Sequence, residues 1–179
     1  MYRKGDPVML QLTKVKKAKK GNDKAFQELI EEEKNKLYRM AYLYVKNEND
    51  AIDIVHETIY KAYISIKKVK EPDYFSTWLS KILINTALDF IKKNKKVIPF
   101  EEVERLESSE DLHIAESLDL VDAIDRLEEK YKTVIILRYY KGLQVKEIAD
   151  MLDCPEGTVK TNLHRAINKL RADLREECL

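Results

Sequence analysis

The chain has 179 residues, enough for one large or two small domains, and its 33 basic residues nearly balance its 32 acidic residues. Few glycines and two cysteines without CxxC spacing exclude a collagen-like chain, a disulfide framework and a zinc knuckle. No apolar run reaches the roughly 20 residues of a membrane span or resembles a signal peptide, so we expect a cytoplasmic protein.

Long segments with apolar residues at helical spacing predict an all-α fold. The first predicted domain, residues 13–96, contains four helices. The first helix begins at Asn22, whose side chain can accept hydrogen bonds from free amides, and carries Phe26, Leu29 and Ile30. The second helix carries Leu37, Met40, Ala41 and Tyr44.

The third predicted helix begins after residues 47–50, ends near Lys68, and has these inward-facing residues: Ile52, Val55, Ile59, Ala62 and Ile66. The fourth helix runs from about Phe75 to Asn94. Its wide apolar stripe comprises Phe75, Trp78, Leu79, Ile82, Leu83, Ala87 and Ile91. Because Phe75 and Trp78 are in register with this stripe, we assign both aromatic rings to core packing.

Residues 97–118 are acidic, contain Pro99 and lack apolar periodicity, which predicts an extended connector. A second helical domain, residues 119–177, follows the connector. One helix carries Leu120, Val121, Ile124 and Leu127, and the next carries Val134, Ile135 and Leu137. Gly142 is predicted to end that helix.

Residues 142–174 have the pattern of a helix-turn-helix. Its first helix is Val145 to Leu152, and Pro155 suits the first position of the second, with Glu156 near the positive end of the helix dipole. The buried stripe of the second helix is Val159, Leu163, Ala166, Ile167, Leu170 and Leu174. A solvated surface helix also carries charges opposite its apolar stripe, but a short first helix, a tight turn and a basic second helix together favour DNA binding.

Several motifs together carry a resemblance to a known family. They are residues 50–60 (DAIDIVHETIY), residues 75–79 (FSTWL) with Asn85 and Asp89, and residues 147–149 and 157–160 with Arg165 and Ala166. In this order they resemble the extracytoplasmic-function (ECF, group IV) sigma factors of bacterial RNA polymerase. One departure is His56, where the family usually has glutamine.

The resemblance implies a polymerase-binding segment and two DNA-reading segments. Asp50, Asp53 and Glu57 share one helix face, which suits a basic or polar partner, although a solvated acidic face has the same pattern. By resemblance the partner is the clamp-helix coiled coil of the polymerase beta-prime subunit, with the beta subunit as a further partner. His56, Tyr60 and Lys61 then lie at the edge of the contact.

For the promoter, the resemblance implies that residues 67–74 form a pocket for a flipped base of the minus-10 element. The expected minus-10 residues are Tyr74, Asn85, Asp89, Lys92 and Lys93. The expected minus-35 residues are Thr158, Lys160, Thr161, His164, Arg165 and Lys169. From composition the connector is an inert tether, whereas by resemblance it threads the polymerase channels.

The function that follows is that of an alternative sigma factor, which binds core RNA polymerase and directs promoter recognition, DNA melting and transcription initiation in a stress or envelope response. By resemblance, an anti-sigma factor anchored at the inner face of the membrane is the expected regulator. The alternative is a two-domain helix-turn-helix regulator that acts without being a polymerase subunit. No enzyme activity, metal, cofactor or small-molecule substrate is expected, because His56-Glu57 lacks the second histidine of a zinc-protease helix and Tyr60 stands in its place.

Overall fold

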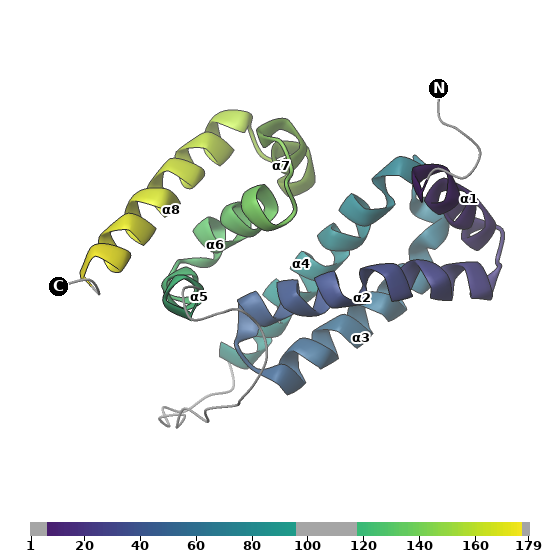
Figure 1. The fold of residues 1–179 in the computed structure, drawn as a ribbon, viewed down its shortest axis with the longest axis horizontal. Helices are drawn as coiled ribbons and strands as arrows, with labels where there is room; N and C mark the ends of the chain where they lie inside the picture. The colour runs from purple at the N-terminus through teal and green to yellow at the C-terminus, as the bar shows by residue number, and fades with distance from the viewer. Residues whose placement is uncertain (1–6, 96–117, 177–179) are drawn as a thin grey trace. The chain divides into compact units, whose positions relative to one another are not determined.

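The computed structural model describes residues 7–95 and 118–176, and all regular structure in these ranges is helical, as predicted (Figure 1). The chain divides into two compact units, Met1–Ile91 and Lys92–Leu179, which are described separately below. The predicted acidic connector lies outside the described residues, apart from Leu118. None of the helices in the described ranges has the length and apolar content that crossing a membrane requires.

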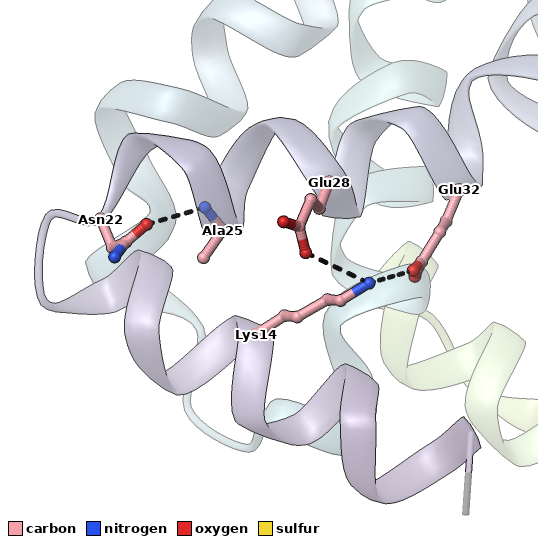
Figure 2. Close-up of polar contacts among 5 residues, drawn as sticks. All are labelled: Lys14, Asn22, Ala25, Glu28 and Glu32. Carbon is pink, nitrogen blue, oxygen red and sulfur yellow. Dashed lines mark hydrogen bonds and ion pairs between the residues drawn. The ribbon is translucent and has the colours of Figure 1, made fainter. Parts of the chain in front are cut away.

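Unit 1 is built from helices joined by short turns. They are α1 (Pro7–Lys19), α2 (Asp23–Val45), α3 (Glu48–Ser65), the 3-10 turns η1 (Ile66–Lys68) and η2 (Pro72–Tyr74), and α4 (Phe75–Lys95), whose last turn continues past Ile91, the end of the unit. The Asn22 side chain caps α2 by accepting a hydrogen bond from the Ala25 amide at 2.8 Å, as predicted (Figure 2). Asn47 caps α3 in the same way through the Asp50 amide, at 3.0 Å. Both helix starts are therefore fixed by local side-chain hydrogen bonds.

The start of unit 1 corrects the predicted order of helices. The two helices expected after Asn22 are one continuous helix, α2, because no glycine or proline interrupts residues 23–45. Before it lies α1, which the sequence analysis missed. Its many lysines are typical of a solvated segment, but Val15 and Ala18 are buried and α1 packs against α2. Tertiary packing therefore stabilises α1.

The inward face of α3 also differs from the prediction at one position. Ile52 is 42% exposed, whereas Ile54 is 1% exposed and lies in the core. The buried residues of α3 are Ala51, Ile54, Val55, Thr58 and Ala62. Ala51 and Ala62 are small and let α2 approach α3 closely. The face of α3 with Ala51 and Ile54 is therefore buried, and the face with Ile52 is exposed.

Helix α4 supplies the other large part of this core. Phe75, Leu79, Leu83 and Ala87 are buried, which confirms the centre of the predicted stripe. Trp78 is half-buried, with its ring centroid 5.9 Å from that of Phe75. The aromatic pair therefore belongs to the packing of unit 1.

Glu33 is an acidic side chain in the interior of unit 1. It is only 4% exposed, and its carboxylate accepts hydrogen bonds from the Ser76 hydroxyl at 3.1 Å and from the Lys36 ammonium at 3.4 Å. The contact with Ser76 joins the middle of α2 to the first turn of α4. Removing a partner of a buried hydrogen bond costs more than the bond itself contributes, because the remaining group loses its hydration without replacement.

We expect Glu33→Ala to lower the free energy of unfolding by about 1–3 kcal/mol. Chemical unfolding followed by circular dichroism measures this change. Glu31→Ala on the same helix is the matched control, because the Glu31 side chain is 66% exposed. Equal stability of the two variants would show that the Glu33–Ser76 contact does not hold α2 and α4 together.

Unit 2 consists of α5 (Leu118–Asp125), α6 (Glu129–Ile135), the π-helical turn η3 (Ile136–Tyr140), α7 (Val145–Leu152) and α8 (Glu156–Glu176). Val134 and Ile135 lie on α6, Leu137 lies on the directly following turn η3, and all three are buried. Leu120, Val121 and Ile124 lie on α5, as predicted, whereas Leu127 follows the end of α5 and is buried. Helix α8 packs against α5, α6 and α7, which places the core of unit 2 along its apolar stripe.

Candidate nucleic-acid and polymerase interfaces

The helix-turn-helix is defined by local capping. The Gln144 amide donates to the Glu147 carboxylate at 2.7 Å in a capping box at the start of α7. Asp153 ends α7 in the left-handed conformation, with φ +53°. The Pro155 carbonyl accepts from the Thr158 amide at 2.9 Å, so Pro155 precedes the first residue of α8 and lies one position before the predicted place. Gly142, with φ +70°, ends the preceding turn as predicted.

Helix α8 has one buried and one exposed face. Val159, Leu163, Ala166 and Leu170 are buried, and Ile167 and Leu174 are half-buried, so the predicted stripe is confirmed. The candidate minus-35 residues are all exposed: Thr158, Lys160, Thr161, His164, Arg165 and Lys169. These side chains therefore face away from the core of unit 2.

The exposed residues of α8 differ in what they already contact. The Thr161 hydroxyl donates to the Gly157 carbonyl at 2.8 Å, and His164 Nε2 lies 3.1 Å from the Asn168 side-chain amide. Arg165 forms no hydrogen bond or ion pair with the described part of the chain. Its guanidinium is thus available for a bidentate contact with a base edge or a phosphate.

Lys169 belongs to a charged cluster between α6 and α8. Its ammonium lies 3.0 Å from the Glu128 carboxylate and 5.1 Å from the centroid of the Tyr131 ring. Lys130 lies 2.8 Å from the same carboxylate. Hydrogen bonds from Lys130 and then Lys169 lower the pKa of the Glu128 carboxyl below its ordinary value. The sequence could not reveal this pairing, because Glu128 and Lys169 are 41 residues apart.

The lowered pKa of Glu128 predicts a dependence of stability on pH. A carboxyl whose pKa is lower in the folded state stabilises the fold above its unfolded pKa of about 4.3. That contribution disappears as the pH falls through the folded pKa. We therefore expect Glu128→Gln to lower the melting temperature slightly at neutral pH and to have no effect in strong acid.

Melting curves of the full chain at a series of pH values measure this difference. Asp150→Asn on α7 is the control, because Asp150 is exposed and forms no ion pair with the described residues. A constant difference between wild type and Glu128→Gln at all pH values would contradict the role of the ionised carboxylate.

The outer side of α3 carries an exposed ridge, which we call the α3 ridge and define as Asp53, His56, Glu57, Tyr60 and Ile64. Tyr60 is 61% exposed and Ile64 is 63% exposed. Sequence analysis missed Ile64, although its spacing of four residues from Tyr60 places it on the same face. Exposed large apolar side chains rimmed by polar residues are typical of a surface that binds another protein.

Two other candidate polymerase-binding residues lie at the edge of the α3 ridge. Asp50 is half-buried at the start of the helix. Lys61 is half-buried too, and its ammonium lies 3.3 Å from the Glu57 carboxylate and donates to the Thr86 hydroxyl on α4 at 3.3 Å. Lys61 therefore joins α3 to α4 and does not extend from the ridge.

The candidate minus-10 residues lie along one side of α4 and before its start. Tyr74 is 56% exposed in the turn η2, directly before α4. Asn85, Asp89, Lys92 and Lys93 are exposed and recur at helical spacing. Lys81, which the sequence analysis missed, is exposed four residues before Asn85 and extends the same face. These side chains form a polar and basic strip.

Comparisons with known proteins identify the family of the chain. Residues 29–97 match the family model for sigma-70 region 2, and residues 117–170 match the model for sigma-70, region 4. RNA polymerase sigma factor SigV of Bacillus subtilis (strain 168) is 42% identical over 152 residues, which is 84% of this chain and 91% of SigV. ECF RNA polymerase sigma factor SigW of the same organism is 32% identical over 192 aligned positions, covering 94% of this chain and 98% of SigW.

A solved structure has the same fold. It is the sigma factor RpoE of Bartonella quintana, crystallised in complex with the anti-sigma factor NepR, with a TM-score of 0.69, 22% identity, and coverage of 85% of this chain and 98% of RpoE. The region 2 match covers most of unit 1 but not α1, and the region 4 match lies within unit 2. The chain belongs to the sigma-70 family of RNA polymerase sigma factors and is homologous to its ECF members.

Proposed function

We propose that this chain is a group IV ECF sigma factor, which binds core RNA polymerase and directs promoter recognition, duplex melting and transcription initiation. The observation that carries the proposal is that each unit exposes a separate candidate interface. These are the α3 ridge and the polar strip of α4 in unit 1, and the basic face of α8 in unit 2. Residues 13–96 then serve polymerase binding and the minus-10 element, residues 97–118 connect, and residues 119–177 read the minus-35 element.

For polymerase binding, we propose that the α3 ridge contacts the clamp helices of the beta-prime subunit. Asp53 and Glu57 offer carboxylates to a basic partner, while Tyr60 and Ile64 offer apolar area. Burying exposed apolar surface contributes about 25 cal/mol per Å², so the two large side chains add affinity that the charges alone do not supply. Asp50, His56 and Lys61 lie within or beside this contact, and the beta subunit is a second partner.

For the minus-10 element, we propose that unit 1 captures the opened strand. Extruding a base from the duplex costs a few kcal/mol, and no nucleotide hydrolysis offsets that cost in this mechanism. The exposed Tyr74 ring can stack on a base, which contributes about 1–3 kcal/mol. Asn85 and Asp89 supply hydrogen-bonding groups, and Lys92 and Lys93 bind the backbone.

For the minus-35 element, we propose that α8 reads duplex DNA in the major groove. Arg165 and Lys160 are exposed cations on this helix, with Thr158, Thr161 and His164 between and beside them. The positive end of the α8 dipole also favours a phosphate near Thr158. We expect Arg165 to contact bases and so to distinguish promoter sequences. We expect Lys169 to contact phosphates and so to add the same affinity for every sequence.

We further propose regulation by an anti-sigma factor anchored at the inner face of the cytoplasmic membrane, with the chain itself in the cytoplasm. The solved complex of RpoE with NepR supports an anti-sigma partner, because RpoE shares the fold of this chain. The signal is proposed to be a stress or envelope response. No catalytic step, metal, cofactor or small-molecule substrate enters this function.

The test is a pull-down with core RNA polymerase, followed by transcription from a promoter library. We expect a stable complex that initiates from a distinct set of promoters. A helix-turn-helix regulator that is not a polymerase subunit would instead bind duplex DNA as a homodimer without polymerase. Absence of a stable complex together with absence of directed initiation would overturn the proposal.

A further inference from the structure

Helix α1 distributes its lysines unequally around its axis. Lys14 faces α2, where its ammonium lies 3.4 Å from the Glu28 carboxylate and 2.5 Å from the Glu32 carboxylate (Figure 2). Lys16 on α1 and Lys20 in the turn that follows α1 are exposed, and neither forms an ion pair with the described residues. The charge of Lys14 is therefore neutralised by α2, whereas the charges of Lys16 and Lys20 are not compensated by the described residues.

The same helix holds the segment between α3 and α4. The half-buried Lys19 ammonium donates to the carbonyl of Val69, and Val69 itself is buried. α1 also contacts η1 and η2, the two turns of this segment. Figure 1 shows α1 beside the end of α4 at which Phe75 begins the helix. This packing fixes α1 against residues 66–74.

Further exposed lysines flank the Val69 anchor. They are Lys67, Lys68 and Lys70, and they too form no ion pair with the described residues. Lys16 lies one turn before Lys19 on α1, and Lys20 directly follows Lys19, so both groups of lysines flank the contact between Lys19 and Val69 along the chain. We define the basic surface as Lys16, Lys20, Lys67, Lys68 and Lys70. The acidic residues of the same segment, Glu71 and Asp73, follow it toward α4.

The basic surface leads directly to the proposed base-capture site. Residues 67–70 belong to the segment that ends at the exposed Tyr74. If one base of a single strand stacks on Tyr74, the adjacent phosphates of that strand lie near residues 67–70. The lysines of this segment attract these phosphates, because their charges are not compensated by the described residues. We infer that the basic surface binds the phosphate backbone of the opened promoter strand beside the captured base, and that α1 is part of the DNA interface. This inference rests on the proposed minus-10 function.

Counterion release gives the inference a quantitative consequence. Each lysine that neutralises a phosphate of a single strand steepens the dependence of log affinity on log salt by about 0.7. Replacing Lys16 and Lys20 by glutamine is therefore expected to reduce the magnitude of this slope by about 1.4 in total. Preference for the promoter sequence should not change, because phosphate contacts carry no sequence information.

The experiment uses holoenzyme and a fluorescent single-stranded oligonucleotide with the non-template minus-10 sequence selected from the promoter library. Affinity is measured over a series of salt concentrations for wild type, the double variant Lys16→Gln/Lys20→Gln, and the control Lys24→Gln/Lys34→Gln. The control makes the same change in charge at exposed positions of α2. Unfolding curves of both double variants verify that the fold is retained.

We expect the smaller slope only in the Lys16→Gln/Lys20→Gln variant. A slope equal to that of wild type, or the same reduction in the control, would overturn the role of the basic surface. These results differ from failure of the proposed function, in which wild-type holoenzyme would show no preference for the selected strand over a scrambled one.

Discussion

The double substitution Asp53→Lys/Glu57→Lys is expected to abolish co-purification of the protein with core RNA polymerase. Both carboxylates are exposed on the α3 ridge, on the side of α3 opposite its buried face. Reversing two charges in a protein interface places like charges together, which costs several kcal/mol. Because each 1.4 kcal/mol corresponds to about tenfold in affinity, the complex should fall below detection in a pull-down.

The measurement is a pull-down with tagged core polymerase, with unfolding curves to show that the variant is folded. Glu31→Lys is the single-substitution control, because Glu31 is exposed and lies on α2, a different helix from the α3 ridge. Asp53→Lys by itself is informative too, since Glu57 also forms an ion pair with Lys61 and its replacement alters that contact. Retained binding by the double variant would remove the α3 ridge from the polymerase interface.

The second large effect is expected for Arg165→Ala, which should relax promoter choice. A bidentate arginine contact with a base is worth about 1–3 kcal/mol of discrimination, or roughly 5- to 150-fold between the right and the wrong base. Arg165 is exposed and forms no hydrogen bond or ion pair with the described residues, so its removal leaves the packing of unit 2 intact. The loss should therefore appear in specificity and not in stability.

Lys169→Ala is the matched comparison and is expected to weaken binding to all promoter sequences by a similar factor. A phosphate contact by Lys169 contributes about 0.9 to the salt slope on duplex DNA. Its ammonium already binds the Glu128 carboxylate, so phosphate binding has to share or replace that ion pair. Transcription from the promoter library with each holoenzyme measures both effects. Identical, sequence-independent losses for Arg165→Ala and Lys169→Ala would refute base reading by Arg165.

The elements predicted most accurately are those with local capping signals. Helix α7 has the predicted bounds, Val145–Leu152, because the Glu147 carboxylate and the turn at Asp153 fix its ends from within the motif. The start of α2 is also fixed by a local signal, the Asn22 side chain that caps the helix. Helix α1 was missed because its many lysines are typical of a solvated segment, and its buried residues become apparent only where it packs on α2.

The candidate sites follow the same division. Helical spacing was sufficient to predict that all the minus-35 candidates share the exposed side of α8, and this is a property of the helix alone. The prediction at Ile52 was wrong because Ile52 and Ile54 are equally apolar, and only contact with α2 decides which of them is buried. Hydrophobic periodicity does not decide which of two equally apolar residues on different faces of one helix is buried.

The sequence by itself thus determined the helical class, the helix-turn-helix and the exposed faces that carry the candidate residues, because these depend on interactions within a few residues along the chain. Only the tertiary structure decided that Lys169 pairs with Glu128, that Lys61 joins α4, and that α1 holds the segment before Tyr74 through Lys19 and Val69. Such pairings join residues 25 to 50 positions apart, and their partners are brought together by the packing of whole helices.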